Sequence, residues 1–360
     1  MAKTVKESRR FLVFIKGNLI FIIALITFLL TRILKHYPHF TELAYSQTIY
    51  PIIAVIVSYF SNIFPFSVSD IFYFFVILFI AGLIGLPFFK KQTLKKTVTN
   101  IVKTIAVIYT LFYWLWGLNY FRDDIYKRVG YENKTIGKTE FTNTFKYIIG
   151  ETIEYFDNEK KIELVEIDSL IEHSYKQLSS KLKIKYPNGR RRPKNITLSH
   201  FFTSAFVGGY FGPFFNEVHI NKYLLPVQIP IILAHEKAHQ FGITNEAEAS
   251  FIAWLVCQNI NSKRIKYSAN LFVLIYFIRQ TKGYEQYDYI IKTIPTEITD
   301  DINNIKQYYQ NLRNPTIDNI QTKLNNWYLK TNSIESGVNN YEGVVSIVCN
   351  YHNSGKYAHQ

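Results

Sequence analysis

The sequence contains little cysteine and little charge. Its 360 residues include only Cys257 and Cys349, which are far apart and form no Cys-x-x-Cys pair. This argues against a disulfide framework and a cysteine-ligated zinc site. We expect two buried thiols, with a single bridge as the alternative. Charged residues make up 19% of the chain and aromatic residues 17%. Because apolar residues are concentrated towards the N-terminus, this balance indicates contact with lipid.

Acidic residues are fewer than basic ones: the chain has 27 Asp and Glu against 41 Lys and Arg, and its formal net charge is +14. Such an excess can bind nucleic acid in a soluble protein. Here much of it flanks apolar segments, where membrane topology explains it. Residues 186–194 form a turn with four positive charges, which we interpret as a solvated loop because interleaved aromatic residues are missing. Attraction to anionic lipid is the alternative. We predict no nucleic-acid partner.

Three apolar segments are predicted to cross a lipid bilayer as helices: residues 17–33, 68–89 and 98–118. The first follows a basic N-terminal tail, as a signal peptide would. No small-residue cleavage site comes after it, so we interpret it as a retained helix. Trp114, Trp116, Tyr120 and Phe121 gather at the end of the third segment and are predicted to mark a membrane interface.

A shorter apolar segment, residues 46–61, is predicted to be an interfacial helix, with a fourth span as the alternative. Lys and Arg are concentrated in the N-terminal tail and in residues 90–96, which places both in the cytoplasm. With three spans, residues 121–360 lie on the extracytoplasmic side, and a fourth span would reverse this. We therefore predict a membrane anchor, residues 1–120, and an extracytoplasmic domain, residues 121–360.

The second part of the chain is predicted to be mainly helical with a short sheet. Residues 137–182 carry apolar side chains at helical spacing and are predicted to be scaffold helices. Glycine and aromatic residues in 206–215 favour a loop and a short strand. Residues 218–221 alternate apolar with polar side chains and are the best strand candidate.

Two helices joined by a tight turn are predicted next. Pro230 can begin a helix without losing a needed donor, and the helix continues to Phe241. Gly242 is suited to end it, and Asn245 can cap a second helix that starts at Glu246.

The first of these helices carries the sequence His-Glu-Lys-Ala-His at residues 235–239. His235 and His239 are four residues apart, so they project from one face of the helix and can give two nitrogen ligands to one zinc ion. Glu236 is placed to reach a water on that zinc and to take its proton as the water attacks a carbonyl group. The competing interpretation, an exposed helix with solvated side chains, is disfavoured by the apolar residues 229–234 before the motif.

A catalytic zinc site needs a third protein ligand besides its open water position. Glu246 and Glu248 are the two candidates. We prefer Glu246, because the turn at Gly242 can fold the second helix back and bring its first turn near the histidines. Glu248 lies nearly two-thirds of a turn further round the helix and is the alternative ligand.

The chain resembles an uncharacterised bacterial family of membrane-anchored, zincin-like proteins known only as a domain of unknown function. The matching segments are residues 116–120, 216–221, 234–240, 246–251 and 336–341. The resemblance covers nearly the whole chain. It implies a zinc metallopeptidase in the bacterial plasma membrane, in which transmembrane helices precede a helix-rich, zincin-like α+β domain.

Residues Glu246-x-x-Ala249-Ser250 also resemble the Glu-x-x-Ala-Asp segment of membrane-bound gluzincins. That resemblance implies that Glu246 ligates the zinc and that residue 250 supports a ligating histidine. The family usually has Asn or Asp at this position. The shorter side chain of Ser250 departs from the pattern and weakens the expected support.

The predicted function is hydrolysis of peptide or related amide bonds, on a peptide or protein substrate that includes those of the cell envelope. Glu217, His219 and Tyr341 are further candidates, for a substrate edge or for oxyanion stabilisation. The alternative is a non-catalytic membrane sensor or assembly factor that keeps a zinc site, against which an intact Glu236 argues. A transporter is disfavoured because the spans hold few polar residues. The sequence predicts no oligomeric state.

Overall fold

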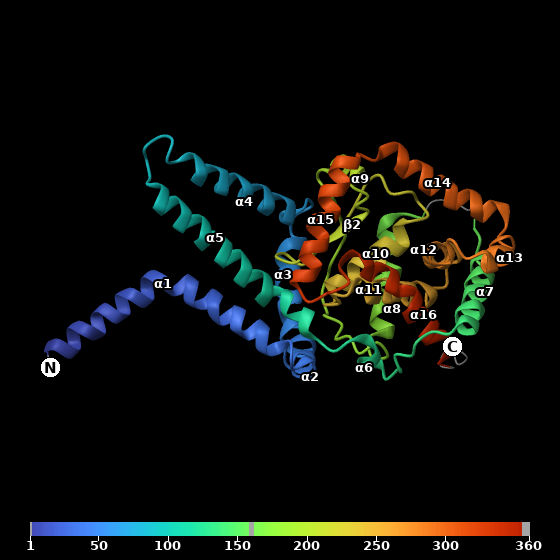
Figure 1. The fold of residues 1–360 in the computed structure, drawn as a ribbon, viewed down its shortest axis with the longest axis horizontal. Coiled ribbons are helices and arrows are strands. Elements are labelled where there is room, and N and C mark those ends of the chain that lie inside the picture. Colours follow the sequence, from blue (N-terminus) through green and yellow to red (C-terminus); the bar gives the residue numbers. More distant parts are fainter. Residues whose placement is uncertain (1, 158–161, 355–360) are drawn as a thin grey trace.

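The computed structural model describes residues 2–157 and 162–354, with side chains from residue 17 onward. Three long apolar helices extend away from a globular part: α1 (Ala2–Leu34), α4 (Val68–Gly85) and α5 (Leu94–Leu115) (Figure 1). Between α1 and α4 lie α2 (Pro38–Thr41), a π-helical segment η1 (Glu42–Ile49) and α3 (Tyr50–Asn62). Figure 1 shows the N-terminus and the α4–α5 turn at the end far from the globular part.

Four segments are long and apolar enough to cross a membrane: residues 17–34, 38–62, 68–85 and 94–115. Three of them overlap the predicted spans, with shifted ends. The predicted range 68–89 extends past its helix, which stops at Gly85 shortly before Pro87. The predicted range 98–118 starts four residues late and passes the break at Trp116, where φ is −159°.

The segment 38–62 lies against the globular part. Tyr50, on α3, donates its hydroxyl hydrogen to the Gln240 carbonyl oxygen at 2.7 Å. The Lys194 ammonium donates to the Ser61 carbonyl oxygen at 2.7 Å. Tyr50 and Ala54 are buried, whereas Ile52 and Ile56 on the other side of α3 are exposed. An apolar helix with one face on the protein and an apolar opposite face fits both a membrane span and an interfacial helix.

Over its described residues, the globular part is mainly helical and holds one small sheet. Its elements are η2 (Gly117–Phe121), α6 (Ile125–Val129), α7 (Lys138–Glu154), α8 (Leu164–Leu178), β1 (Lys194–Asn195), α9 (Ser199–Ser204), β2 (Gly209–Gly212), β3 (Glu217–Ile220), α10 (Ile229–Gln240), α11 (Glu246–Gln258), α12 (Lys263–Thr281), η3 (Glu285–Tyr287), α13 (Asp288–Ile291), α14 (Thr296–Leu312), α15 (Pro315–Thr331), η4 (Gly337–Gly343) and α16 (Val344–Asn353). The predicted helical range 137–182 corresponds to α7 and α8, except that residues 158–161 lie outside the described residues.

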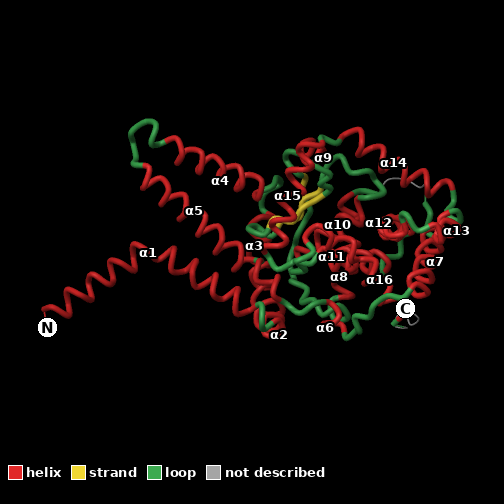
Figure 2. Tube along the Cα trace, in the orientation of Figure 1, coloured by secondary structure: helices red, strands yellow, loops and turns green. Residues whose placement is uncertain are grey.

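The sheet has the strand order β1-β3-β2. β1 pairs in parallel with β3, and β2 pairs antiparallel with β3 in the register Gly209 to Ile220 and Gly212 to Glu217. The predicted strand 218–221 is therefore present, shifted by one residue. Figure 2 shows the strands on the side of the helical part from which α4 and α5 extend.

The core is built around α10, α11 and α12, and α11 is buried from Glu246 to Cys257. Because α11 is enclosed on all sides, its apolar residues show no single face, which is typical of a central helix. Cys257 and Cys349 are both free and buried, as the sequence predicts. The helix that carries the histidines is thus packed inside the domain.

The loop 186–194 differs from the predicted solvated loop. Arg190 and Arg192 are exposed, but Arg191 and Lys194 are buried. Arg191 pairs with Glu172 on α8 at 3.0 Å, and Lys194 pairs with Glu217 on β3. A count of positive charges in the sequence cannot separate cations that face water from cations that have buried acidic partners.

A buried ion network holds the back of α10 to α8. The fully buried Lys237 ammonium lies 2.5 Å from Glu172 and 2.7 Å from Asp168. Burial opposes ionisation of Glu172, but Lys237 and Arg191 outweigh it and lower its pKa from 4.5 to about 2. The network fixes α10 on the side opposite the histidines.

The Glu172 pKa predicts a loss of stability in acid. Because the folded-state pKa is lowered, the contribution of this carboxylate is complete above pH 4.5 and is lost as the pH falls towards about 2. Glu172→Gln is expected to lower the free energy of unfolding at neutral pH by about 3 kcal/mol and to flatten this acid dependence. Denaturant unfolding of the detergent-purified protein across that pH range measures both. Glu166→Gln, on the exposed face of α8, is the control; equal acid profiles for the two variants would contradict the assignment.

Candidate metal centre

Helices α10 and α11 are joined by a tight turn that brings their facing side chains together. Gly242 has a φ of +84°, which favours glycine, and a Cβ atom there would lie 3.0 Å from both Asn119 Oδ1 and Tyr50 Cε1. The Asn245 side chain accepts a hydrogen bond from the Glu248 amide at 3.0 Å and caps α11. The turn at Gly242 and the cap at Asn245 are confirmed, and the helix predicted from Pro230 to Phe241 is present one residue earlier, as Ile229–Gln240.

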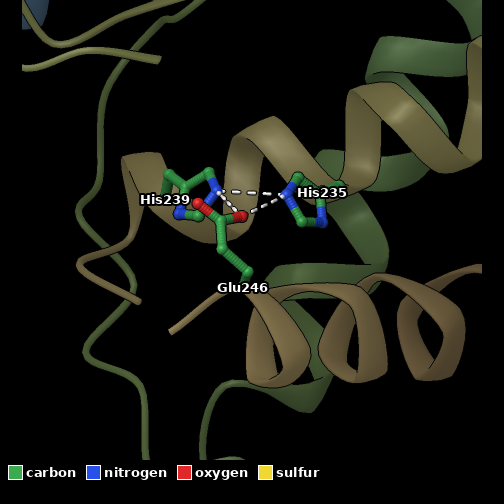
Figure 3. Close-up of side chains that lie close together, drawn as sticks. All are labelled: His235, His239 and Glu246. Carbon is green, nitrogen blue, oxygen red and sulfur yellow. Dashed lines mark hydrogen bonds and ion pairs between the residues drawn. The ribbon is translucent and has the colours of Figure 1, made fainter. Parts of the chain in front are cut away.

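His235, His239 and Glu246 face one another across this turn (Figure 3). Glu246 Oε2 lies 3.1 Å from His235 Nε2 and 3.2 Å from His239 Nε2, and the two Nε2 atoms are 3.1 Å apart. Ligand atoms at about 2.0–2.1 Å from a tetrahedral zinc ion stand about 3.3 Å from one another. The three side chains therefore fit a metal ion of this size, and the cluster can hold one.

The second nitrogen of each histidine has a partner that fixes the orientation of its ring. The Ile243 carbonyl oxygen lies 2.7 Å from His239 Nδ1, and Ser250 Oγ lies 3.2 Å from His235 Nδ1. The Ile243 carbonyl oxygen can only accept, so it keeps a proton on His239 Nδ1, and both contacts turn the Nε2 atoms towards Glu246. Ser250 therefore reaches the histidine despite its short side chain. The fully buried position of Ser250 holds the hydroxyl close to the ring.

The Ser250 hydroxyl is expected to tighten metal binding. Ser250→Ala removes the partner of His235 Nδ1 and should weaken zinc affinity by roughly tenfold or more. Competition with a chromophoric chelator measures the change. Ser268→Ala is a matched control, because Ser268 is also buried but contacts the Ile231 amide at the other end of α10. Equal zinc affinities in both variants would show that Ser250 has no such role.

Strong electrostatic coupling links the three side chains. Burial opposes ionisation of Glu246, but His239 and His235 outweigh it and lower the pKa of the Glu246 carboxyl. Burial likewise opposes protonation of His239, and the Glu246 carboxylate outweighs it and raises the His239 pKa to about 9. The protonated histidine and the Glu246 carboxylate thus form a compact group of opposite charges. A divalent cation can take the place of the histidine proton.

Glu248 points away from the cluster. Its carboxylate forms a buried ion pair with Arg128 on α6. Of the two acidic residues that the sequence leaves as alternatives, the structure brings Glu246 to the histidines and gives Glu248 a different partner. The two-residue offset on α11 separates the two directions, as the helix geometry predicts.

A cleft of about 650 Å³ opens over the three side chains, and Glu236 lies on its wall. Burial raises the pKa of Glu236, and the nearby His235 and His239 oppose that shift. The backbone of β2 crosses directly over this carboxylate. A Cβ atom on Gly209 would lie 2.9 Å from Glu236 Cγ, so a side chain at this position would displace Glu236.

The three further candidates from the sequence divide into two groups. Glu217 accepts hydrogen bonds from the Val68 and Ser69 amides at the start of α4 and pairs with Lys194. His219 is fully buried, 2.8 Å from Ser67 Oγ. These two residues join β3 to α4. Tyr341 lines the cleft, and its ring lies 6.4 Å from the His235 ring.

The end of α10 is held by three side chains from the first part of the chain, on α3, at the end of α5 and just after η2. Trp116 donates its indole hydrogen to the His239 carbonyl oxygen at 2.9 Å, and Arg122 donates to the Gly242 carbonyl oxygen at 2.9 Å. Tyr50 donates its hydroxyl hydrogen to the Gln240 carbonyl oxygen.

The sequence interpretation assigned Trp116 and Phe121 to a membrane interface, but both are buried in protein. Only Trp114 of that group is exposed. These supports carry no sequence pattern, because side chain to carbonyl contacts depend on tertiary placement.

Comparison with known proteins matches the chain to a protein family. The profile of a family described as "Protein of unknown function (DUF3810)" matches residues 45–349, which include α3 to α5 and every residue of the cluster. No curated protein and no solved structure matches the chain.

Proposed function

We propose that this chain, which belongs to the DUF3810 family, is a membrane-anchored zinc metallopeptidase that hydrolyses peptide or related amide bonds. The observation that carries the proposal is the spacing of His235, His239 and Glu246 beside Glu236 in one cleft. Three nitrogen and oxygen ligands on two helices, with a carboxylate next to the first histidine, are the set that a catalytic zinc site uses.

The proposed mechanism assigns a role to each polar group. His235, His239 and Glu246 would hold the zinc, which when bound acts as a Lewis acid on the scissile carbonyl and lowers the pKa of a water molecule. Glu236 takes the proton of the attacking water and passes it to the leaving amine. Its raised pKa suits both tasks, because a general base that returns its proton works best when its pKa is close to the working pH.

The strand β2 supports a peptide as the substrate. Among the described strands it is an edge strand, and Gly209, Tyr210 and Phe211 line the cleft. An extended peptide can add to such an edge through main-chain hydrogen bonds. Burial and Glu246 raise the pKa of Tyr341, which keeps its hydroxyl hydrogen available for a developing oxyanion.

The anchor is proposed to cross the membrane three times, through α1, α4 and α5. The protein contacts of segment 38–62 support its assignment as an interfacial helix instead of a span. The N-terminal tail and the lysine-rich α4–α5 turn lie at the same end of these helices (Figure 1). Their positive charge favours the cytoplasm, which would put the metal centre on the extracytoplasmic side of a bacterial plasma membrane.

Removal of the metal tests the proposed activity. Treatment of the detergent-purified protein with a chelator is expected to abolish cleavage of a peptide library, because Glu236 alone does not activate water sufficiently. Stoichiometric zinc should restore cleavage and magnesium should not, since the nitrogen ligands suit zinc. Cleavage that survives complete zinc removal would contradict the proposal.

A further inference from the structure

Helix α15 has its apolar side turned outward. Ile320, Leu324 and Trp327 follow one another at four and three residues and share one face, and they are 55%, 61% and 68% exposed. The other side of the helix buries Leu329 and also turns polar groups inward: Asp318, Gln321 and Asn325 line the cleft over the metal cluster. A surface helix in water keeps its large apolar residues on the inner side, and the three on the outer face of α15 depart from that arrangement.

The helix stands beside the end of a membrane helix. The Tyr328 ring lies 6.1 Å from the Phe112 ring on α5, and the Tyr113 hydroxyl donates to Asn332 Oδ1 at 2.9 Å. Figure 1 shows α15 between α10 and α11 and the side from which α4 and α5 extend, and it runs across the direction of those two helices. α15 is therefore located where α5 leaves its apolar stretch.

A second exposed apolar group continues this surface towards α4. Leu198 and Phe201, at the start of α9, are both exposed. The neighbouring Thr197 amide donates to Asp70 Oδ2 on α4 at 2.8 Å. Lys323 and Lys330 are exposed on α15 next to the apolar stripe. The exposed apolar face of α15 and the two lysines beside it thus lie next to the ends of α4 and α5. An apolar face flanked by lysines suits a bilayer with anionic lipid headgroups.

We infer that α15 lies in the surface of the bilayer through Ile320, Leu324 and Trp327, and that the cleft receives peptides which an apolar anchor holds in that bilayer. The second part rests on the proposed peptidase function. α15 forms the wall between the metal cluster and the lipid, and Trp116 and Tyr120, which follow α5, line the same cleft. A peptide held at the lipid surface reaches Glu236 without crossing the domain.

The position of α15 is tested by depth-dependent quenching. Cys257 and Cys349 are buried, so a cysteine introduced at an exposed position is labelled selectively. A fluorophore at Leu324→Cys, in vesicles of phosphatidylcholine and phosphatidylglycerol, should be quenched by headgroup-level lipid nitroxides and shielded from aqueous iodide. Val165→Cys on α8, where Val165 is 82% exposed, is the control and should show the reverse. Iodide quenching at Leu324→Cys equal to the control would overturn the inference. Shielding without lipid quenching would also overturn it, because a protein partner would then cover α15.

The substrate class is tested separately. Peptides from one library, with and without an N-terminal palmitoyl chain, are compared in the same vesicles. We expect at least tenfold faster cleavage of the acylated form and loss of that advantage in the double variant Ile320→Ser, Leu324→Ser. Equal cleavage of both forms overturns the substrate class and leaves the peptidase function standing. If neither form is cleaved while the quenching result holds, the peptidase function fails and the bilayer contact of α15 remains.

Discussion

Glu236→Gln is expected to reduce peptide hydrolysis by roughly 10³-fold while the protein keeps its zinc. The amide has nearly the shape of the carboxylate, so the close passage of β2 at Gly209 is preserved. It cannot accept a proton from water, and the step assigned to Glu236 is lost. The measurement is the cleavage rate of the best library peptide, together with the zinc content of the same preparation.

Glu342→Gln is the matched control for this variant. Glu342 also lines the cleft, but it lies outside α10 and is exposed. Its replacement should change the rate much less than that of Glu236. A Glu236→Gln enzyme with nearly wild-type activity and full zinc content would exclude this residue as the general base. Full zinc content with no cleavage by the wild-type protein would favour the sensor or assembly factor instead.

The second large expected effect is on zinc binding, and it distinguishes the role of Glu246 from that of Glu248. Glu246→Gln removes the charged member of the cluster and is expected to abolish stoichiometric zinc binding, because the neutral amide is a far weaker zinc ligand. Glu248→Gln should keep the zinc, since its carboxylate faces Arg128. It should instead lower the free energy of unfolding by about 3 kcal/mol, because a buried guanidinium loses its counter-charge.

Metal analysis and denaturant unfolding on the same two preparations measure this contrast. The variants are well matched, since both replace a buried glutamate in the first turn of α11. Loss of zinc in Glu248→Gln with retention in Glu246→Gln would reverse the ligand assignment. Loss in both variants without a difference in stability would indicate that α11 as a whole supports the site.

Local signals in the sequence account for the parts of the structure that were predicted well. Pro230 in the first turn of α10, Gly242 just after its end and Asn245 at the cap of α11 each act through the backbone chemistry of one residue. The apolar helices near the N-terminus follow from composition alone. The grouping of His235, His239 and Glu246 could be predicted from the sequence, because the periodicity of the two helices and the tight turn between them determine it.

The features that could not be predicted from the sequence depend on tertiary packing. Ser250 reaches His235 because α11 is buried and packs closely against α10. The spacing of residues in the sequence does not give the distance between two packed helices. Arg191 and Lys194 resemble a solvated basic loop until Glu172 and Glu217, distant in the sequence, become their partners. Trp116 resembles a membrane-interface residue, although its indole holds the carbonyl oxygen of His239.

The most direct test of the metal centre is elemental analysis of the detergent-purified protein beside its His239→Ala variant. The proposed function predicts about one zinc ion per wild-type chain, in keeping with the one His-His-Glu cluster found among the described residues, and almost none in the variant. The variant must remain folded, which its near-ultraviolet circular dichroism reports. A folded wild-type protein that contains no zinc and takes up none on addition would contradict the assignment of the site.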